Sequence, residues 1–293
     1  MKAIRATLIG PTLLLVLIVL AWAISWPVIK VGVANLPPVW YGCLRYAVAT
    51  VCLFAYLAAR KALLFPPRSD WPLVAVSGVL QMAAYSALTG MALTILPPGR
   101  ASVLAFSTPL WVVPLAAWRL QERVSRLALL GVAMGLVGVL VIALPSLRAD
   151  GGDQIGAYCM LVGASAAWAV SIVFVRSHRM AVSALALAPW QMVIASALLC
   201  LAALTTEGPI PRLDGTSIAS LLYVGPVATA FAYWAVVAVG QYFPARTVSM
   251  SLLATPCLGI LASALALGEV VDHTLIMGLA LVGTGIAVST KSH

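Results

Sequence analysis

Long stretches without a charged side chain recur along the whole of this chain, and they restrict its fold more than any other feature. A helix needs about 18 to 20 apolar residues to cross the hydrocarbon of a bilayer, and most of these stretches reach that length. The sequence therefore predicts an all-α integral membrane protein with ten transmembrane helices. The stretches are residues 6–29, 38–59, 71–99, 101–118, 127–147, 154–175, 180–206, 215–245, 247–268 and 273–290, of which only 38–59 contains a charge, Arg45.

Composition agrees with this interpretation and excludes several classes of function. Hydrophobic residues make up 63% of the 293 residues, charged residues make up only 9%, and the mean hydropathy is +1.07. Soluble domains carry about 25% charged residues. The connections are too short for a separate soluble domain, so any function must lie within the membrane. The cysteines fall in apolar stretches without metal-ligand spacing and are expected to pack as small hydrophobes. They are Cys43, Cys52, Cys159, Cys200 and Cys257.

Basic residues are dispersed along the chain, so the net charge of +9 reflects membrane topology and not nucleic-acid binding. With a cytoplasmic N-terminus, ten crossings place twelve basic residues inside and three outside, which satisfies the positive-inside rule. We therefore expect a multi-pass protein of the cell (inner or plasma) membrane whose two termini are cytoplasmic. The twelve are Lys2, Arg5, Arg60, Lys61, Arg68, Arg119, Arg123, Arg126, Arg176, Arg179, Arg246 and Lys291, and the three are Arg100, Arg148 and Arg212.

The first apolar stretch has two interpretations. Lys2 and Arg5 precede it, and Ala21-Trp22-Ala23 has the small-x-small form of a signal-peptidase site. The same three residues return in mid-chain as Ala167-Trp168-Ala169, where no signal peptidase acts. We therefore expect the first stretch to be retained as a membrane span.

This recurrence belongs to an internal repeat that covers residues 1–147 and 148–293. Each half holds five predicted spans, and an odd number requires the second copy to lie upside down relative to the first. Inverted repeats give a transporter two related shapes, one open to each side, and place the substrate near the midplane where the halves meet. Pairs aligned by a shift of 147 residues include Gly78 with Gly225, Thr108-Pro109 with Thr255-Pro256, and Glu122 with Glu269.

With these motifs the chain resembles the EamA-type branch of the drug/metabolite transporter superfamily, over residues 12 to 290. The resemblance rests on the Trp-Ala-x-Ser segments at Trp22 and Trp168, on the two Thr-Pro pairs, and on the glutamate beyond each pair. The first half departs from the pattern at Gln121, where the second half has Gly268. Within the branch, the chain is similar to YddG-type exporters of aromatic amino acids. The resemblance implies export of amino acids.

Pro109 and Pro256 are expected inside the fourth and ninth spans, as helix breaks with a role in gating. Each removes an N–H donor and frees the carbonyl of the residue four positions earlier, Ala105 or Leu252. In lipid such carbonyls must face protein or a wet cavity, so paired breaks indicate a substrate site. The alternative is a pair of kinks that neighbouring helices satisfy.

Polar and aromatic residues near these breaks are the candidates for substrate binding. Gln81 and Tyr85 share one helix face because they are four residues apart. Trp22 and Trp168 lie away from the interfaces where aromatic belts form. The alternatives are hydrogen bonding between helices for the serines and ordinary packing for the tryptophans. The full set is Trp22, Gln81, Tyr85, Ser102, Trp168, Ser249 and Ser251.

Charged residues give a weaker signal. Arg45 either serves function within the membrane or extends its charge to the outer surface, and both interpretations stay open. Lys30 is expected at the outer interface, and Glu122 and Glu269 are expected to support the following helix. All eight acids fall in loops or at span ends, so no mid-membrane carboxylate is available to bind a proton or sodium. No metal or cofactor site is predicted.

The sequence therefore predicts an alternating-access exporter of small organic solutes, with amino acids favoured, that works as a facilitator driven by the solute gradient. The alternatives are a carrier of drugs or other metabolites, including nucleotide sugars, and a membrane-embedded enzyme. An enzyme needs a paired acid, a histidine cluster or metal ligands at depth, and the sequence offers none. The expected partners are the bilayer and a small-molecule substrate, and no oligomeric state is predicted.

The topology is open to a direct test. Single cysteines introduced at Arg60, Arg123 and Arg179, in a variant without native cysteines, are expected to resist an impermeant thiol reagent in intact cells and to react after permeabilisation. Labelling of residue 60 or 179 from outside would overturn the arrangement.

Overall fold

The computed structural model describes residues 2–148, 152–243 and 245–291, and within these residues every regular element is a helix. The all-helical fold class is therefore confirmed. The helices are α1 (Lys2–Asn35), α2 (Pro38–Ala59), η1 (Arg68–Asp70), α3 (Trp71–Val76), η2 (Ser77–Ala84), α4 (Tyr85–Ile95), α5 (Pro98–Ala105), α6 (Thr108–Leu120), α7 (Arg126–Arg148), α8 (Gly152–Arg176), α9 (Ala184–Thr206), α10 (Gly215–Tyr223), η3 (Val224–Phe231), α11 (Ala232–Val239), α12 (Ala245–Leu252), α13 (Ala254–Leu267) and α14 (His273–Lys291).

Eight helical segments among the described residues are long and apolar enough to cross a membrane. Two further apolar helices, Ala254–Leu267 and His273–Ser289, lie in the ninth and tenth expected spans but are shorter. The ninth is shortened because one helix ends at Leu252 and the next begins at Ala254. The described residues thus hold eight candidate membrane spans, and the number of ten crossings stays a prediction.

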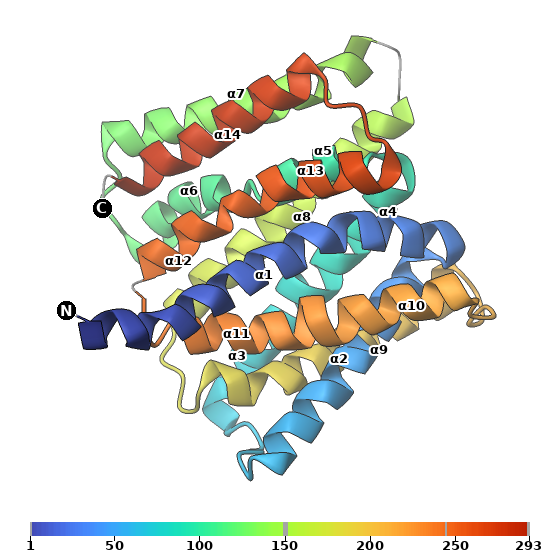
Figure 1. Ribbon diagram of the computed structural model, residues 1–293, viewed down its shortest axis with the longest axis vertical. Helices are drawn as coiled ribbons and strands as arrows, with labels where there is room; N and C mark the ends of the chain where they lie inside the picture. Colours follow the sequence, from blue (N-terminus) through green and yellow to red (C-terminus); the bar gives the residue numbers. More distant parts are fainter. Residues whose placement is uncertain (1, 149–151, 244, 292–293) are drawn as a thin grey trace.

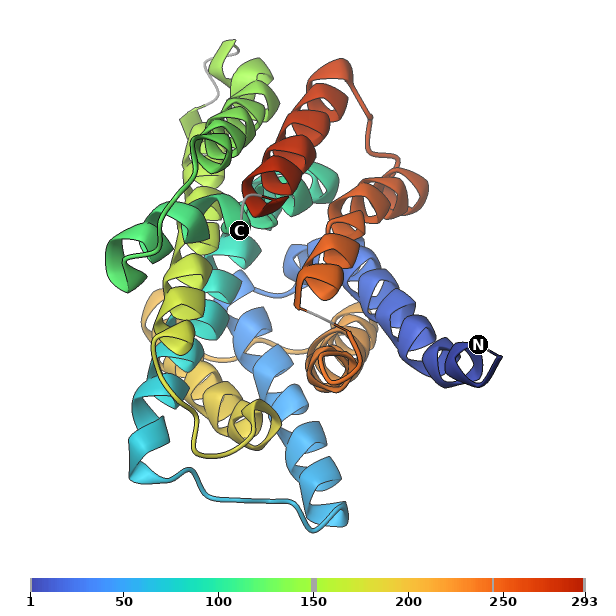
Figure 2. The ribbon, with the colours of Figure 1, turned by 90° about the vertical axis from the view of Figure 1, so that its left-hand side faces the viewer.

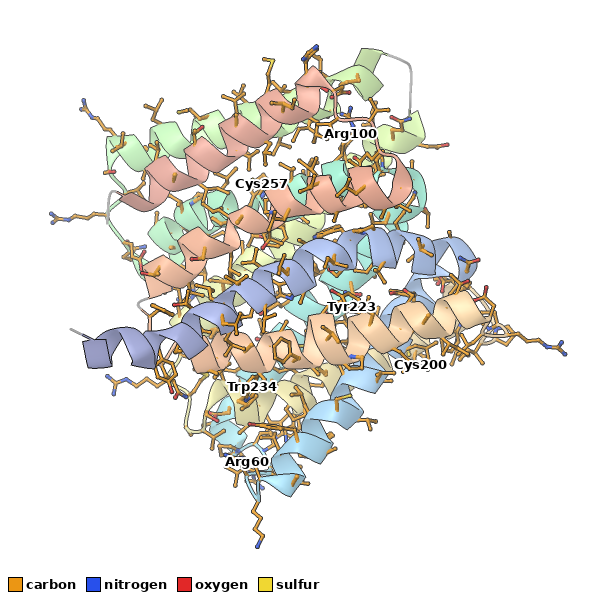
Figure 3. The ribbon with its side chains drawn as sticks, in the orientation of Figure 1. Arg60, Arg100, Cys200, Tyr223, Trp234 and Cys257 are labelled. Atoms are coloured by element: carbon orange, nitrogen blue, oxygen red, sulfur yellow. The ribbon has the colours of Figure 1, made fainter. Side chains whose placement is uncertain are left out.

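The helices lie side by side with their long axes roughly aligned (Figure 1). The N-terminal end of α1 and the C-terminal end of α14 lie on the same side of the molecule. Helices α7 and α14 form a pair along one edge, which Figure 2 shows from a second direction. Figure 3 shows nitrogen-tipped side chains projecting mainly near helix ends, where Arg60 and Arg100 are labelled. The bundle therefore presents apolar side chains along its length and its charges at the two ends.

Irregular backbone occurs at paired places in this bundle. The segments η2 and η3 wind as π-helices, a rare form that is frequent at functional sites. The path from α5 to α6 breaks at Phe106 and Ser107, and the path from α12 to α13 breaks at Leu253. Both the π-helices and the breaks recur at a spacing of 147 residues.

The two prolines begin new helices and do not bend continuous ones. Pro109 and Pro256 lie in the first turn of α6 and α13, where a backbone N–H has no partner within the helix in any case. Ala105 is fully buried, and its carbonyl accepts a hydrogen bond from the Thr108 hydroxyl at 3.0 Å. Of the two environments that the sequence allowed for this carbonyl, protein or a wet cavity, the structure therefore shows protein. A gating role for the two prolines stays a prediction.

Small residues bring α7 and α14 into backbone contact. A methyl group added at Gly285 would lie 2.5 Å from the carbonyl oxygen of Gly131, and one added at Gly131 would lie 2.5 Å from the carbonyl oxygen of Gly285. Glycines allow such close approach of membrane helices, where van der Waals contact replaces the hydrophobic effect as the source of association. Gly138 and Gly278 meet in the same way further along the pair. The α7–α14 pair is therefore held by direct backbone packing.

Acidic side chains at the ends of helices hold distant parts of the chain together. Glu207, at the end of α9, accepts hydrogen bonds from the N–H groups of Val39 and Trp40 at 3.0 and 2.9 Å. These N–H groups are among the four at the start of α2 that lack a helical partner. Asp70 is fully buried and accepts bonds from the N–H groups of Ala181 and Val182.

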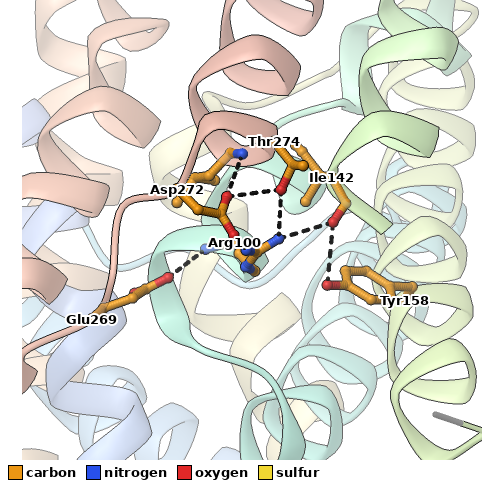
Figure 4. Close-up of polar contacts among 7 residues, drawn as sticks. Arg100, Ile142, Tyr158, Glu269, Asp272 and Thr274 are labelled. Carbon is orange, nitrogen blue, oxygen red and sulfur yellow. Dashed lines mark hydrogen bonds and ion pairs between the residues drawn. The ribbon is translucent and has the colours of Figure 1, made fainter. Parts of the chain in front are cut away.

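The carboxylate of Glu269 binds the unpaired N–H groups at the start of α5 in the same way. It accepts bonds from the N–H groups of Gly99 and Arg100 at 2.7 and 3.2 Å. The expectation that it supports the following helix is therefore wrong, because it supports a helix from the other half of the chain. The Arg100 guanidinium in turn pairs with Asp272 and donates to the carbonyl of Ile142 at 3.0 Å (Figure 4). This cluster joins α5, α7 and the segment before α14.

Substitution of the contact glycine tests the packing of α7 against α14. Gly285→Leu is expected to destabilise the protein by about 1 to 3 kcal/mol, as overpacking of a close interface does. Gly283→Leu is the matched control, because nothing lies within 4 Å of a methyl group added there. Thermal unfolding in detergent micelles gives the comparison. Equal destabilisation by both substitutions would contradict a specific role for the Gly285 contact.

Candidate functional site

One cavity lies among the helices, and both halves of the chain line it. Its walls come from α1, α2, η2, α4 and the α5–α6 break in the first half, and from α8, α9, η3 and α11 in the second. It holds about 800 Å³ of empty space, counting the solvent space at its opening. Both π-helices contribute to its wall, so the irregular backbone borders the cavity.

Four of the residues expected at the substrate site line this cavity: Trp22, Gln81, Tyr85 and Trp168. The rings of Tyr85 and Trp168 meet edge to face with their centroids 5.1 Å apart, a favourable arrangement of aromatic rings. The Trp22 indole N–H donates to the carbonyl of Ala228 in η3 at 2.9 Å, so the indole is anchored across the cavity. Their role in substrate binding stays a prediction.

Gln81 lies in η2 and faces α8. Its side-chain oxygen is 3.3 Å from the hydroxyl of Ser171, which also lies 3.3 Å from the hydroxyl of Ser77. The hydroxyl of Ser171, itself in contact with that of Ser77, therefore orients the amide of Gln81. An oriented amide can both donate to and accept from a bound solute.

The three serines expected in the cavity do not line it where the structure describes them. Ser102 is fully buried, donates to the carbonyl of Gly99 at 2.7 Å and packs against α13 close to Gly259. Ser251 donates to the carbonyl of Thr247 at 2.9 Å within its own helix. These two residues satisfy carbonyls of their own helices, so these bonds are neither cavity contacts nor the hydrogen bonds between helices that the alternative interpretation expected. The side chain of Ser249 lies outside the part of the chain that the structure describes.

Sequence patterns missed several residues of the cavity wall. Phe106 lies at the α5–α6 break, and its ring centroid is 6.5 Å from that of Trp22. Tyr233 lies in α11 and donates to the side-chain oxygen of Gln191 at 3.3 Å. Thr229 lies in η3 and bonds to Arg45. Only Arg45 carried a signal in the sequence, as a charge within an apolar stretch.

Other polar groups are engaged away from the cavity. The Lys30 ammonium donates to the carbonyls of Leu93 and Thr94 at 2.6 and 3.3 Å, so it satisfies the C-terminal end of α4. Glu122 pairs with Arg176 at 2.6 Å. The acidic residues that the structure describes lie in loops or within the first or last turn of a helix. The cavity wall is therefore mostly aromatic and apolar, with hydroxyl, amide and guanidinium groups and no carboxylate.

This architecture defines a class of protein. A bundle of membrane-spanning helices around a cavity, with irregular helices in the cavity wall, is the arrangement of a membrane transport protein. The comparison with protein families identifies it further. The chain belongs to the EamA-like transporter family, whose model matches residues 10–144 and again residues 155–291. It is a transporter and not an enzyme.

Several relatives share the full length of the chain. The aromatic amino acid exporter YddG of Ancylobacter novellus is 28% identical over 293 residues, covering 99% of this chain and 98% of the relative. A probable amino-acid metabolite efflux pump of Salmonella typhimurium is 28% identical, covering 94% and 93%. A solved crystal structure covers 96% of both chains with 25% identity and a TM-score of 0.66. The fold and the transporter class therefore extend over the whole chain.

The cavity residues are tested by truncation. Trp168→Ala and Gln81→Ala are each expected to lower transport by roughly tenfold, because a lost contact of about 1.4 kcal/mol changes an equilibrium by that factor. Trp118→Ala is the control, because Trp118 is 74% exposed on the outside of the bundle and is expected to leave transport unchanged. Flux is measured in proteoliposomes at matched protein content. Retained flux in both cavity variants would remove this site, and loss of expression would favour a packing role.

Proposed function

We propose that the protein exports small organic solutes by alternating access, with neutral and aromatic amino acids as the favoured substrates. The observation that carries the proposal is a cavity lined by both halves of the chain, with aromatic walls and a few oriented polar groups. Such a wall suits a largely apolar amino acid better than a phosphate-rich nucleotide sugar. The names of two relatives, an aromatic amino acid exporter and a probable amino-acid metabolite efflux pump, support the same substrates.

We further propose that residues 1–147 and 148–293 are inverted repeats with cytoplasmic termini. Features spaced by 147 residues support this, namely the two π-helices and the two helix breaks. A third pair is Gln121 and Gly268, which both adopt left-handed backbone conformations, with φ of 55° and 66°. The placement of both chain ends on one side of the bundle supports an even number of crossings.

Two glutamates that occupy equivalent positions in the two halves make different contacts. Such a difference is expected if the structure represents one of the two states of an alternating-access carrier. Glu269 supports the first turn of α5, whereas Glu122, its repeat partner, pairs with Arg176. Within the described residues, no hydrogen bond joins Glu122 to the start of α12, the position equivalent to the start of α5. Exchange of these two arrangements between the halves would generate the second state of an alternating-access cycle.

The proposed mechanism is facilitated flux without ion coupling, because the described residues of the cavity wall include no carboxylate to bind a proton or sodium. Among the acidic residues, Glu269 comes closest to a candidate for ion coupling. Burial raises the pKa of the Glu269 carboxyl, although hydrogen bonds from the N–H groups of Gly99 and Arg100 act in the opposite direction. It lies in the loop before α14 and faces a helix end, so we assign it a structural role.

Proteoliposomes test the mechanism. A gradient of an amino acid such as phenylalanine is expected to drive net flux in either direction, and an imposed pH or sodium gradient is expected not to concentrate it. Empty liposomes and the Trp168→Ala variant serve as controls. Uphill accumulation under a proton gradient, abolished by an ionophore, would contradict facilitation, and Glu269→Gln and Glu122→Gln would then locate the coupling group. Absence of flux for every amino acid would instead favour a drug or another metabolite as substrate.

A further inference from the structure

We propose that Arg45 is the carboxylate-binding residue of the cavity, so that the transported solutes are organic carboxylates with an apolar or aromatic body. The inference rests on the proposed transport function and specifies the chemistry of its substrate. Its basis is a guanidinium that is held against the cavity by the opposite half of the chain and that has no acidic partner among the described residues.

The position of Arg45 is set by helix packing. It lies two turns into α2, which begins at Pro38, and it lines the cavity. Its Nε–H donates to the hydroxyl oxygen of Thr229 at 2.8 Å, and that hydroxyl donates to the carbonyl of Val224 at 2.8 Å. This carbonyl belongs to the residue five positions before the threonine, and the π-helical winding of η3 brings it within reach of the threonine side chain. The guanidinium is therefore directed inward to η3, which argues against a side chain that extends to the membrane surface.

The bond to Thr229 occupies only part of the guanidinium. An arginine carries five N–H donors in a planar fork, and this bond uses Nε alone. The two terminal nitrogens have the geometry that binds a carboxylate through a pair of parallel hydrogen bonds. The ring of Tyr46 lies 5.2 Å from the guanidinium carbon and supports the cation without neutralising it.

The balance of charge in the cavity favours an anion. Arg45 is the only charged residue among the described residues of the wall. The two ion pairs found in the described part of the chain are Arg100 with Asp272 and Arg176 with Glu122, and neither includes Arg45. Arg45 is half-buried, and a cation that is partly withdrawn from water is stabilised by an anionic partner. A solute carboxylate supplies that pair and leaves when the cavity opens, as a permanent protein carboxylate does not.

The remainder of the cavity fits the rest of such a solute. Trp22, Tyr85 and Trp168 offer aromatic surface to an apolar side chain. The wall offers no second charged group, so a solute ammonium finds only aromatic faces and polar oxygens such as that of Gln81. The carboxylate is therefore expected to contribute more to binding than the ammonium.

Binding to the full-length protein in detergent micelles tests this, with quenching of tryptophan fluorescence as the readout. The probes are phenylalanine, 3-phenylpropionate, which lacks the ammonium, and phenylalaninamide, which lacks the carboxylate. Both acids are expected to bind at least roughly tenfold more tightly than the amide, the effect of a lost hydrogen bond to a charged group. Arg45→Gln is expected to remove this preference, and Arg45→Lys is expected to retain part of it. Arg60→Gln, at the exposed end of α2, is the matched control and keeps it.

Equal binding of the acids and the amide to the wild-type protein would overturn the carboxylate site, as would an acid preference that survives Arg45→Gln. If that variant does not fold, the binding of the three probes to the wild-type protein and to Arg45→Lys still tests the carboxylate site. Flux measurements separate this proposal from the transport function. Transport of the amide with no preference for acids overturns the carboxylate site alone, whereas acid-selective binding without flux of any probe overturns transport alone.

Discussion

Hydrocarbon offers no partner to a backbone N–H or C=O group, and the rest of this structure depends on that constraint. Regular helices satisfy it along most of the chain. Where the backbone is irregular, side chains complete the hydrogen bonding: Thr108 bonds to the carbonyl of Ala105 beside the helix break, and Thr229 bonds to the carbonyl of Val224 in η3. Both π-helices contribute residues to the cavity wall, so the cavity and this irregular backbone occur together.

The same constraint acts at the ends of the helices, where the first N–H groups are unpaired. Glu207 and Glu269 satisfy such groups on helices from the opposite half of the chain. The carboxylates of these two residues thus have a structural role at helix ends. The described residues of the cavity wall include no carboxylate. Backbone contact between Gly131 and Gly285 joins the halves at another place. Acidic residues and glycines thus hold the helices together, and aromatic residues line the cavity.

The electrostatics of the cavity follow from this placement of the acidic residues at helix ends. With the described acids at helix ends, the guanidinium of Arg45 is the only charge on the wall, and its inward direction is set by a hydroxyl of η3. A wall of this kind favours a solute that carries an anionic group and an apolar body. It also separates the question of which solute binds from the question of what drives its movement, because the group that attracts the solute is not an ionisable acid.

Hydropathy and residue spacing determined the helical membrane fold, because the length of an apolar stretch and the thickness of a bilayer are both readable without coordinates. The transporter class was likewise accessible from the motifs that carry the family resemblance. Four cavity residues, among them Gln81 and Trp168, were accessible from spacing and from the depth of a residue in its span. Tertiary structure alone decided that Ser102 and Ser251 turn to their own backbone, since a hydroxyl bonds to whichever carbonyl lies nearest. It alone decided that Glu269 supports α5, and that Arg45 points inward to Thr229. A side chain's partner depends on which helices become neighbours, and the π-helical winding that brings Thr229 within reach of Arg45 arises from that packing and has no signature in the sequence of a single helix.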